Sequence, residues 1–198
     1  MTAVAVALVV SLTLPLAQGA APAPSAALDR SKGVVAAFLK VPAKAGPARD
    51  QAFKDLDGFL DLEGMVASAI DPRKDKLSAA ERGRFQKRFR DLLRVVAYTD
   101  SGDFFRSAKL TWGSPRVDGE DALVPCKVVV PAEDLQTELE FRWRQVGGAV
   151  RIVDVAFEGD SLTKDYQNQI ARIVDKNGGA GLLKVLDEKW AEVSGSKK

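Results

Sequence analysis

The apolar residues of this chain change their spacing twice, near residue 108 and again near residue 159. Before the first change they recur at helical intervals, as in Phe85, Phe89, Leu92 and Val96. Between the two changes they alternate with polar residues at every second position. Because a period near 3.6 belongs to helices and a period of 2 to strands, the sequence predicts helices, then a sheet, then helices again.

Three helical segments are predicted before the sheet, over residues 26–41, 48–70 and 78–98. Gly58 and Gly64 are candidate breaks in the second segment. The third begins with a capping box, in which Ser78 and Glu81 satisfy each other's free amides. Basic residues on this helix are interpreted as a solvated face, with contact to anionic lipid headgroups or to a partner as the alternative: Arg82, Arg84, Lys87, Arg88 and Arg90.

Four strands are predicted in the middle of the chain, over residues 108–117, 122–130, 135–146 and 149–157. Asp118-Gly119 and Gly147-Gly148 are hairpin signals between neighbouring strands. In the third strand, Leu139, Phe141 and Trp143 alternate with charged residues, which indicates one buried face and one wet face. The strands therefore favour an antiparallel meander.

Helical spacing resumes after Gly159, with a break at Gly178-Gly179 and a last short helix over residues 182–190. Helices thus flank the strands on both sides along the chain. The sequence predicts an α+β fold in which a four-stranded antiparallel meander sheet packs against N-terminal and C-terminal helices.

Histidine is absent and cysteine occurs once, at Cys126. A Ser-His-Asp triad, a Cys-His pair and an imidazole zinc ligand are therefore excluded. Cys126 lies in a valine-rich predicted strand, which favours a buried, inert thiol. Asp71, Asp75 and Glu81 lack the spacing of a calcium loop, and a net charge of +2 argues against a nucleic-acid binder. We predict no catalytic residue, metal site, cofactor or nucleic-acid partner.

Ser161 follows Gly159 at a predicted strand-to-helix turn, where an α/β-hydrolase carries its nucleophile. A nucleophilic serine needs a base, and Lys164 is poorly placed for that role, one turn along the same helix. An N-cap is the favoured interpretation, because Ser161 precedes an apolar-periodic segment. The negative charge of Asp165 also suits the positive end of the helix dipole.

Residues 3–16 form an uncharged apolar run that is too short for a comfortable membrane span. Small residues follow at 17–21 and offer A-x-A-like cleavage sites, so residues 1–23 are predicted to be a secretory signal peptide. No Lys or Arg precedes the run, which leaves an uncleaved N-terminal anchor as the alternative. We expect an exported protein with one domain over residues 24–193 and a disordered tail over residues 194–198.

A longer pattern surrounds Ser161. It comprises Val153-Asp154-Val155, Glu158-Gly159, Ser161-Leu162, Tyr166, Gln169, Gly178, Gly181 and Leu182. Upstream, the helix over residues 78–98 adds Phe85, Phe89, Leu92, Leu93 and Tyr98. This pattern, over residues 50–186, resembles the toluene-tolerance/MlaC family of periplasmic phospholipid-binding proteins.

The resemblance implies a phospholipid carrier rather than an enzyme. It implies an apolar cavity between sheet and helices that holds acyl tails while headgroups stay largely exposed. It also implies a periplasmic monomer that takes part in outer-membrane lipid asymmetry. The implied partners are an outer-membrane lipoprotein complex and the substrate-binding component of an inner-membrane ABC transporter, an arrangement in which this chain is the auxiliary shuttle.

Candidate lipid-binding residues come from the apolar faces of the predicted strands and their covering helices. On the last strand Val153, Val155 and Phe157 are expected on one side. The full set is Phe85, Phe89, Leu92, Val128, Leu139, Phe141, Trp143, Val153, Val155, Tyr166 and Ile170. Two alternatives stay open: a small NTF2-like enzyme with Asp154 as a base inside a cavity, and a ligand-free adaptor with a solid core.

Overall fold

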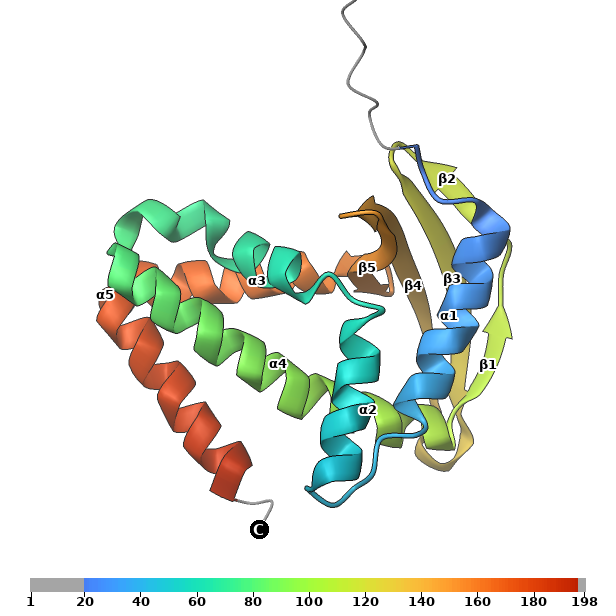
Figure 1. Cartoon of the computed structure of the whole chain (residues 1–198), viewed down its shortest axis with the longest axis horizontal. Coiled ribbons are helices and arrows are strands. Elements are labelled where there is room, and N and C mark those ends of the chain that lie inside the picture. The colour runs from blue at the N-terminus through green and yellow to red at the C-terminus, as the bar shows by residue number, and fades with distance from the viewer. Residues whose placement is uncertain (1–19, 196–198) are drawn as a thin grey trace, which may run out of the picture.

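The structure is a computed structural model that describes residues 20–195 (Figure 1). Most of the predicted signal peptide (1–23) and the end of the predicted tail (194–198) lie outside the described residues. The elements are α1 (Pro24–Phe38), α2 (Pro47–Asp57), α3 (Leu62–Ile70), η1 (Asp71–Lys76), α4 (Ala79–Ser107), β1 (Lys109–Trp112), β2 (Arg116–Asp118), β3 (Asp121–Val130), η2 (Pro131–Glu133), β4 (Leu135–Val146), β5 (Ala149–Phe157), β6 (Asp160–Ser161) and α5 (Leu162–Gly195). Of the helices in this part of the chain, none is long and apolar enough to cross a membrane.

The predicted α+β fold and antiparallel sheet are confirmed, but the described residues form six strands rather than four. The strands lie in the order β1-β3-β4-β5-β6, and β2 also pairs with β3. The strand predicted over residues 108–117 is divided into β1 and β2, and the two-residue β6 extends the other edge. The meander order through β3, β4 and β5 is the one predicted.

Pro125 explains why the first predicted strand is divided. A proline has no N–H to donate to a neighbouring strand. Its carbonyl accepts a hydrogen bond from the Gly113 amide (2.9 Å), directly after β1. The chain passes so close here that a Cβ on Gly113 would lie 2.9 Å from the Pro125 ring. The strand therefore leaves the ladder opposite Pro125 and rejoins it as β2.

A β-bulge in β5 changes which residues face the core. The register between β4 and β5 shifts between Arg142 and Trp143, which leaves Val153 as the extra residue. Ile152, the partner of Trp143, is 1% exposed in the core. Val153 instead lines a polar cleft on the other side of the sheet, whereas Val155 lies on the core side. The prediction that Val153 and Val155 share one face is therefore wrong.

The chain turns from β5 into β6 through a two-residue hairpin. Glu158 and Gly159 both have positive φ, at 50° and 86°, as a type I′ turn requires. The Ser161 hydroxyl then accepts a hydrogen bond from the Lys164 amide (3.1 Å). The predicted N-cap of α5 is confirmed, because the side-chain oxygen satisfies a first-turn amide.

The helix α4 begins where its predicted cap places it. The Glu81 carboxylate accepts from the Ser78 amide (2.8 Å) while the Ser78 hydroxyl accepts from the Glu81 amide (3.3 Å), so the capping box is confirmed. The second predicted segment breaks after Gly58 into α2 and α3, but Gly64 lies within α3. The third continues as α4 to Ser107, beyond its predicted end at residue 98.

The last helix, α5, consists of two helical segments that meet at Gly178. The φ of 68° and ψ of −176° at this residue are non-helical, and a positive φ of this size is readily adopted by glycine. After the break the second segment runs back beside α4 (Figure 1). The predicted break and a final helix are thereby confirmed, but that helix extends to Gly195, beyond its predicted end at residue 190.

Buried apolar side chains form two clusters. The first, here called the sheet cluster, joins α1, α2 and the second half of α4 to one face of the sheet. The second, here called the helical cluster, joins α3, the first half of α4 and α5. Figure 1 shows the same division, with α1 across the sheet and α3 and α5 together on the other side of the molecule. The long helix α4 contributes to both clusters.

Candidate functional site

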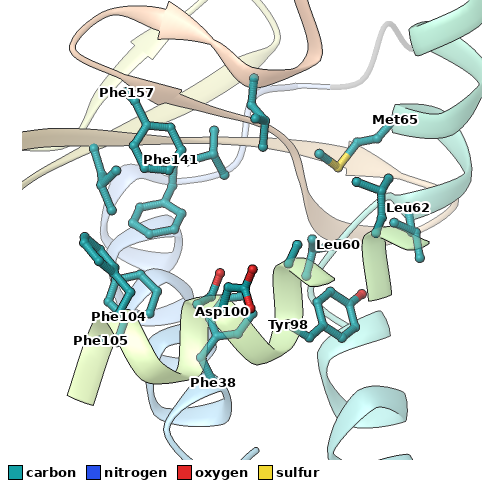
Figure 2. Close-up of a pocket in the computed structure, with 16 residues that line it drawn as sticks. Phe38, Leu60, Leu62, Met65, Tyr98, Asp100, Phe104, Phe105, Phe141 and Phe157 are labelled. Atoms are coloured by element: carbon teal, nitrogen blue, oxygen red, sulfur yellow. The ribbon is translucent and has the colours of Figure 1, made fainter. Parts of the chain in front are cut away.

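An apolar pocket of about 260 Å³ lies between α4 and the strands β4 and β5. Figure 2 shows Phe141 and Phe157 on the strand side, Phe104 and Tyr98 on α4, and Met65 on α3 arranged around an open space. The lining residues are Phe38, Leu60, Leu62, Met65, Leu93, Ala97, Tyr98, Asp100, Ser101, Phe104, Phe105, Leu139, Phe141, Val155, Phe157 and Leu162.

The pocket lies where the two clusters meet. Most of its buried lining residues, including Phe38, Phe105 and Leu139, belong to the sheet cluster. Leu62 and Leu93 belong to the helical cluster. A space between two packing units is a common place for a ligand pocket, because neither unit fills it completely.

The lining is almost free of polar atoms. Side-chain oxygens occur only on Tyr98, Asp100 and Ser101 among the residues that line the pocket. The Tyr98 hydroxyl is already engaged, since it donates to the Asp57 carboxylate at 2.9 Å. Burial, together with the negative charge of Asp57, raises the pKa of Tyr98 well above its usual range. The described lining therefore offers an apolar ligand a hydrocarbon surface with a single charged group, Asp100.

Three of the predicted lipid-binding residues line this pocket: Leu139, Phe141 and Val155. Two others, Val128 and Trp143, are fully buried in the sheet cluster and do not line it. Trp143 packs against α1, where its indole N–H donates to the Ser31 hydroxyl at 2.8 Å. Trp143 thus holds α1 on the sheet that forms one wall of the pocket.

The predicted helical residues lie elsewhere, in or against the helical cluster. Phe85, Phe89, Leu92 and Ile170 are buried there, and Tyr166 packs against it. The Phe89 ring lies 5.2 Å from both the Phe85 and Tyr166 rings. None of the five lines the apolar pocket. The structure therefore divides the predicted site residues between a pocket wall and a filled core.

Val153 and Asp154 face the polar side of the sheet. Both line a polar cleft that also contains Arg142. The Asp154 carboxylate accepts a hydrogen bond from the Thr163 amide at 3.0 Å, so it is a second cap of α5. The enzyme alternative placed Asp154 inside a cavity as a base, but Asp154 does not line the apolar pocket.

A sequence model of the MlaC protein family matches residues 35–188, a range that contains the whole pocket lining. The chain belongs to the MlaC family. Among solved structures, a phospholipid-binding protein from Ralstonia solanacearum, determined in complex with a phospholipid, is similar with a TM-score of 0.65 and 19% identity. The likeness covers 88% of this chain and 99% of that one, and it shows that the two share a fold. No curated protein matches the sequence.

Within this MlaC-family fold, sequence reasoning missed several pocket residues at the end of α4. Phe104 and Phe105 line the pocket beyond the predicted helix end. A signal was available, because Tyr98 and Phe105 are seven residues apart, as on one helical face. The intervening Thr99 and Gly102 are poor helix formers and obscured it.

The basic face of α4 in this MlaC-family chain is occupied by ion pairs within the molecule. Arg84 and Arg88 contact Asp187, and Arg90 contacts Glu63 at 2.7 Å. Lys87 pairs with Asp91 along the helix, and Arg82 donates to two backbone carbonyls. These contacts favour the structural interpretation of the basic residues over contact with anionic headgroups.

The described part of the MlaC-family chain contains no group of three His, Cys, Asp or Glu residues that could hold a metal ion. Cys126 is buried in β3, as predicted. Burial raises the pKa of its thiol to about 11, so at neutral pH the thiol keeps its proton and is a poor nucleophile.

Proposed function

We propose that this protein binds phospholipid, with acyl chains in the apolar pocket and the headgroup outside, and acts as a carrier rather than a catalyst. The observation that carries the proposal is the pocket itself, lined by hydrocarbon from β4, β5, α3 and α4. Each methylene removed from water contributes about 0.8 kcal/mol. Ten buried methylenes would therefore contribute on the order of 8 kcal/mol, enough for tight binding without recognition of the headgroup.

The size of the pocket adds one condition to this proposal. A volume of about 260 Å³ is slightly below the range of pockets that enclose drug-sized ligands. We therefore infer that the pocket widens when acyl chains enter. Phe157, which is 43% exposed, and Phe104, which is half-buried, are the lining side chains best able to move.

The comparisons support the same proposal. The family is named for MlaC, and the related solved structure is a phospholipid-binding protein with a bound phospholipid. We propose that this chain is exported to the periplasm by its N-terminal signal peptide. There it would carry phospholipid between an outer-membrane lipoprotein complex and the substrate-binding component of an inner-membrane ABC transporter, and so help to maintain lipid asymmetry.

Native mass spectrometry of protein purified from a Gram-negative periplasm tests the proposal. Bound phospholipid is expected on the folded protein, and the mass of the polypeptide also reports whether the signal peptide was removed. A mass equal to the bare chain, with no lipid acquired from phospholipid vesicles, would contradict lipid binding. Recovery of the protein only in the cytoplasm would contradict the proposed location.

Two variants on one strand locate the binding site. Val155→Asp places a charge in the pocket wall and is expected to abolish lipid retention, because an uncompensated carboxylate is costly in an apolar site. Val153→Asp is the matched control, since Val153 lies two residues away on the polar side of the sheet. Circular dichroism checks that both variants are folded. Equal lipid retention by the two variants would show that the apolar pocket is not the lipid-binding site.

A further inference from the structure

Among residues 20–195, Asp100 is the one charged residue that lines the apolar pocket. It lies on α4 and is exposed, and Figure 2 shows its carboxylate projecting from the helix toward the open space. Within residues 20–195 its carboxylate has no hydrogen bond or ion pair. An uncompensated negative charge therefore stands where an apolar ligand would leave the pocket for water.

The nearest charged residues farther along α4 do not neutralise it. Asp103 is paired with Arg106. The same Arg106 also donates to the backbone carbonyls of Leu39 and Val41. Its guanidinium is thus committed to the loop after α1, and Asp103 does not line the pocket. Of the two acidic residues one turn apart on this helix, only Asp100 faces a bound ligand.

We propose that Asp100 selects the headgroup charge of the bound lipid. This inference rests on the proposed function, in which acyl chains fill the pocket and the headgroup stays at its opening. A phospholipid whose headgroup carries an amine can place its positive charge near the carboxylate. A phospholipid whose headgroup is an uncharged alcohol offers only its phosphate, which the carboxylate repels. The phosphate is common to both lipids, so the amine decides between them.

The size of the preference follows from the exposure of Asp100. An exposed pair of opposite charges gains only a fraction of its full Coulomb energy, because water and salt screen it. Measured energies of exposed ion pairs correspond to factors of roughly 1.5 to 5 in affinity at 25 °C. We therefore expect a selectivity of about two- to fivefold, superimposed on tight binding of either lipid through its acyl chains.

A competition experiment tests this role. The protein is incubated with vesicles that contain equal amounts of ethanolamine- and glycerol-headgroup phospholipids with identical acyl chains, and the bound lipids are measured by mass spectrometry. The wild type should be enriched about two- to fivefold in the ethanolamine lipid. Asp100→Asn should bring the bound ratio close to that of the vesicles, and Asp100→Lys should reverse it. Total lipid per folded protein should stay constant.

Asp103→Asn is the matched control, because it removes the same charge from the same helix outside the pocket lining. It should keep the wild-type lipid ratio. Raising the salt to 1 M, where the Debye length is about 3 Å, should reduce the preference of the wild type toward that of Asp100→Asn. A ratio that responds equally to both substitutions would assign the effect to net charge and overturn the proposal.

The outcomes separate this inference from the function on which it rests. A wild type that acquires neither lipid contradicts the proposed function and the role of Asp100 together. Full lipid loading with the same ratio in the wild type and Asp100→Asn contradicts the role of Asp100 alone. Enrichment of the wild type in the glycerol lipid would also overturn it.

Discussion

The sheet cluster and the helical cluster contain the same kinds of apolar side chain but use them differently. In the helical cluster, the Phe89 ring on α4 packs against the rings of Phe85 on the same helix and Tyr166 on α5. In the sheet cluster, Phe141 on β4 and Phe105 on α4 are walls of the same pocket. Apolar periodicity therefore identifies the buried faces of this protein, but it does not tell which face meets an unfilled space.

Truncation of Phe85 is expected to cause the largest loss of stability. Phe85 is 0% exposed, and removal of a buried phenylalanine costs about 3–5 kcal/mol. Phe104→Ala, on the same helix but half-buried, should cost about 1 kcal/mol. Unfolding in urea, followed by circular dichroism, measures both free energies. Equal losses would show that the two clusters are packed alike, and would contradict the proposed difference between them.

The same two variants should show the opposite order in their effects on phospholipid binding. Under conditions where both are folded, Phe85→Ala should load phospholipid like the wild type, because Phe85 does not line the pocket. Phe104→Ala should retain less, because it removes part of the pocket wall. Loss of lipid from folded Phe85→Ala would extend the site into the helical cluster, as the sequence alone predicted.

A second comparison concerns one carboxylate in each region. On the polar face of the sheet, Asp121 is 2% exposed and accepts from Arg144 at 2.6 Å and from Arg142 at 2.9 Å. Burial alone would raise the pKa of Asp121, but the hydrogen bonds from the two arginines outweigh it, so the pKa lies below its usual range. Beside the helical cluster, the exposed Asp175 pairs with Arg73 and Lys76, whose hydrogen bonds also lower its pKa.

Asp121→Asn should therefore reduce stability at pH 7 by about 1–3 kcal/mol, less than for a fully buried pair because both arginines are partly exposed. A depressed pKa in the folded state contributes stability above the unfolded value, near 3.9 for aspartate. That contribution is lost as the pH falls from there through the folded pKa. Urea unfolding at pH 7 and at pH 3 should show a smaller pH effect in Asp121→Asn than in the wild type.

Asp175→Asn is the matched control for this experiment, because its ion pairs are exposed and screened by water. It should change stability at pH 7 far less than Asp121→Asn. If the two substitutions have equal effects, burial on the sheet does not strengthen the Asp121 pair.

A smaller effect is expected where α1 meets the sheet. Trp143 is 0% exposed, and its indole N–H donates to the Ser31 hydroxyl, which in turn donates to the Ala27 carbonyl at 2.9 Å. Ser31→Ala leaves the indole N–H without its partner, which should cost about 1–2 kcal/mol with no change in lipid loading. Ser107→Ala, at an exposed residue, is the control. A neutral Ser31→Ala would mean that water replaces the hydroxyl.

The features that the sequence predicted well are those set by a few neighbouring residues. The Ser78 capping box, the Ser161 cap and the Gly147-Gly148 hairpin depend on contacts within one turn, so the local residues suffice to predict them. The bulge at Val153 depends on the register against another strand. Neither β4 nor β5 alone carries that information, so the change of face between Val153 and Val155 was missed.

Pocket membership was harder still, because it depends on how the two clusters meet. Phe141 and Phe85 both lie on correctly predicted apolar faces and both are buried. Only Phe141 lines the pocket, because α4 passes from one cluster to the other between Phe85 and Phe105. Along α4, the spacing of apolar residues is the same in the sheet cluster and in the helical cluster. That spacing therefore predicts which side chains are buried, but not which of them line a ligand pocket.

The smallest expected effect is at the joint between the two regions, where β6 leads into α5. Ser161 and Asp154 cap different amides of the first turn, those of Lys164 and Thr163. Ser161→Ala should cost about 1 kcal/mol, and Asp154→Ala a similar amount, with the double variant close to their sum because separate amides are involved. Urea unfolding measures all three.

Ser161→Asp and Ser114→Ala complete this test of the joint. Ser161→Asp should restore most of the stability lost in Ser161→Ala, since aspartate is an equally good N-cap and its charge favours the helix N-terminus. Ser114→Ala, in the exposed loop between β1 and β2, should be neutral. A cap acts only on stability, so every folded variant should load phospholipid like the wild type. If folded Ser161→Asp loses lipid, Ser161 contributes to the lipid-binding site itself. That result would contradict the claim that Ser161 acts only as a helix cap.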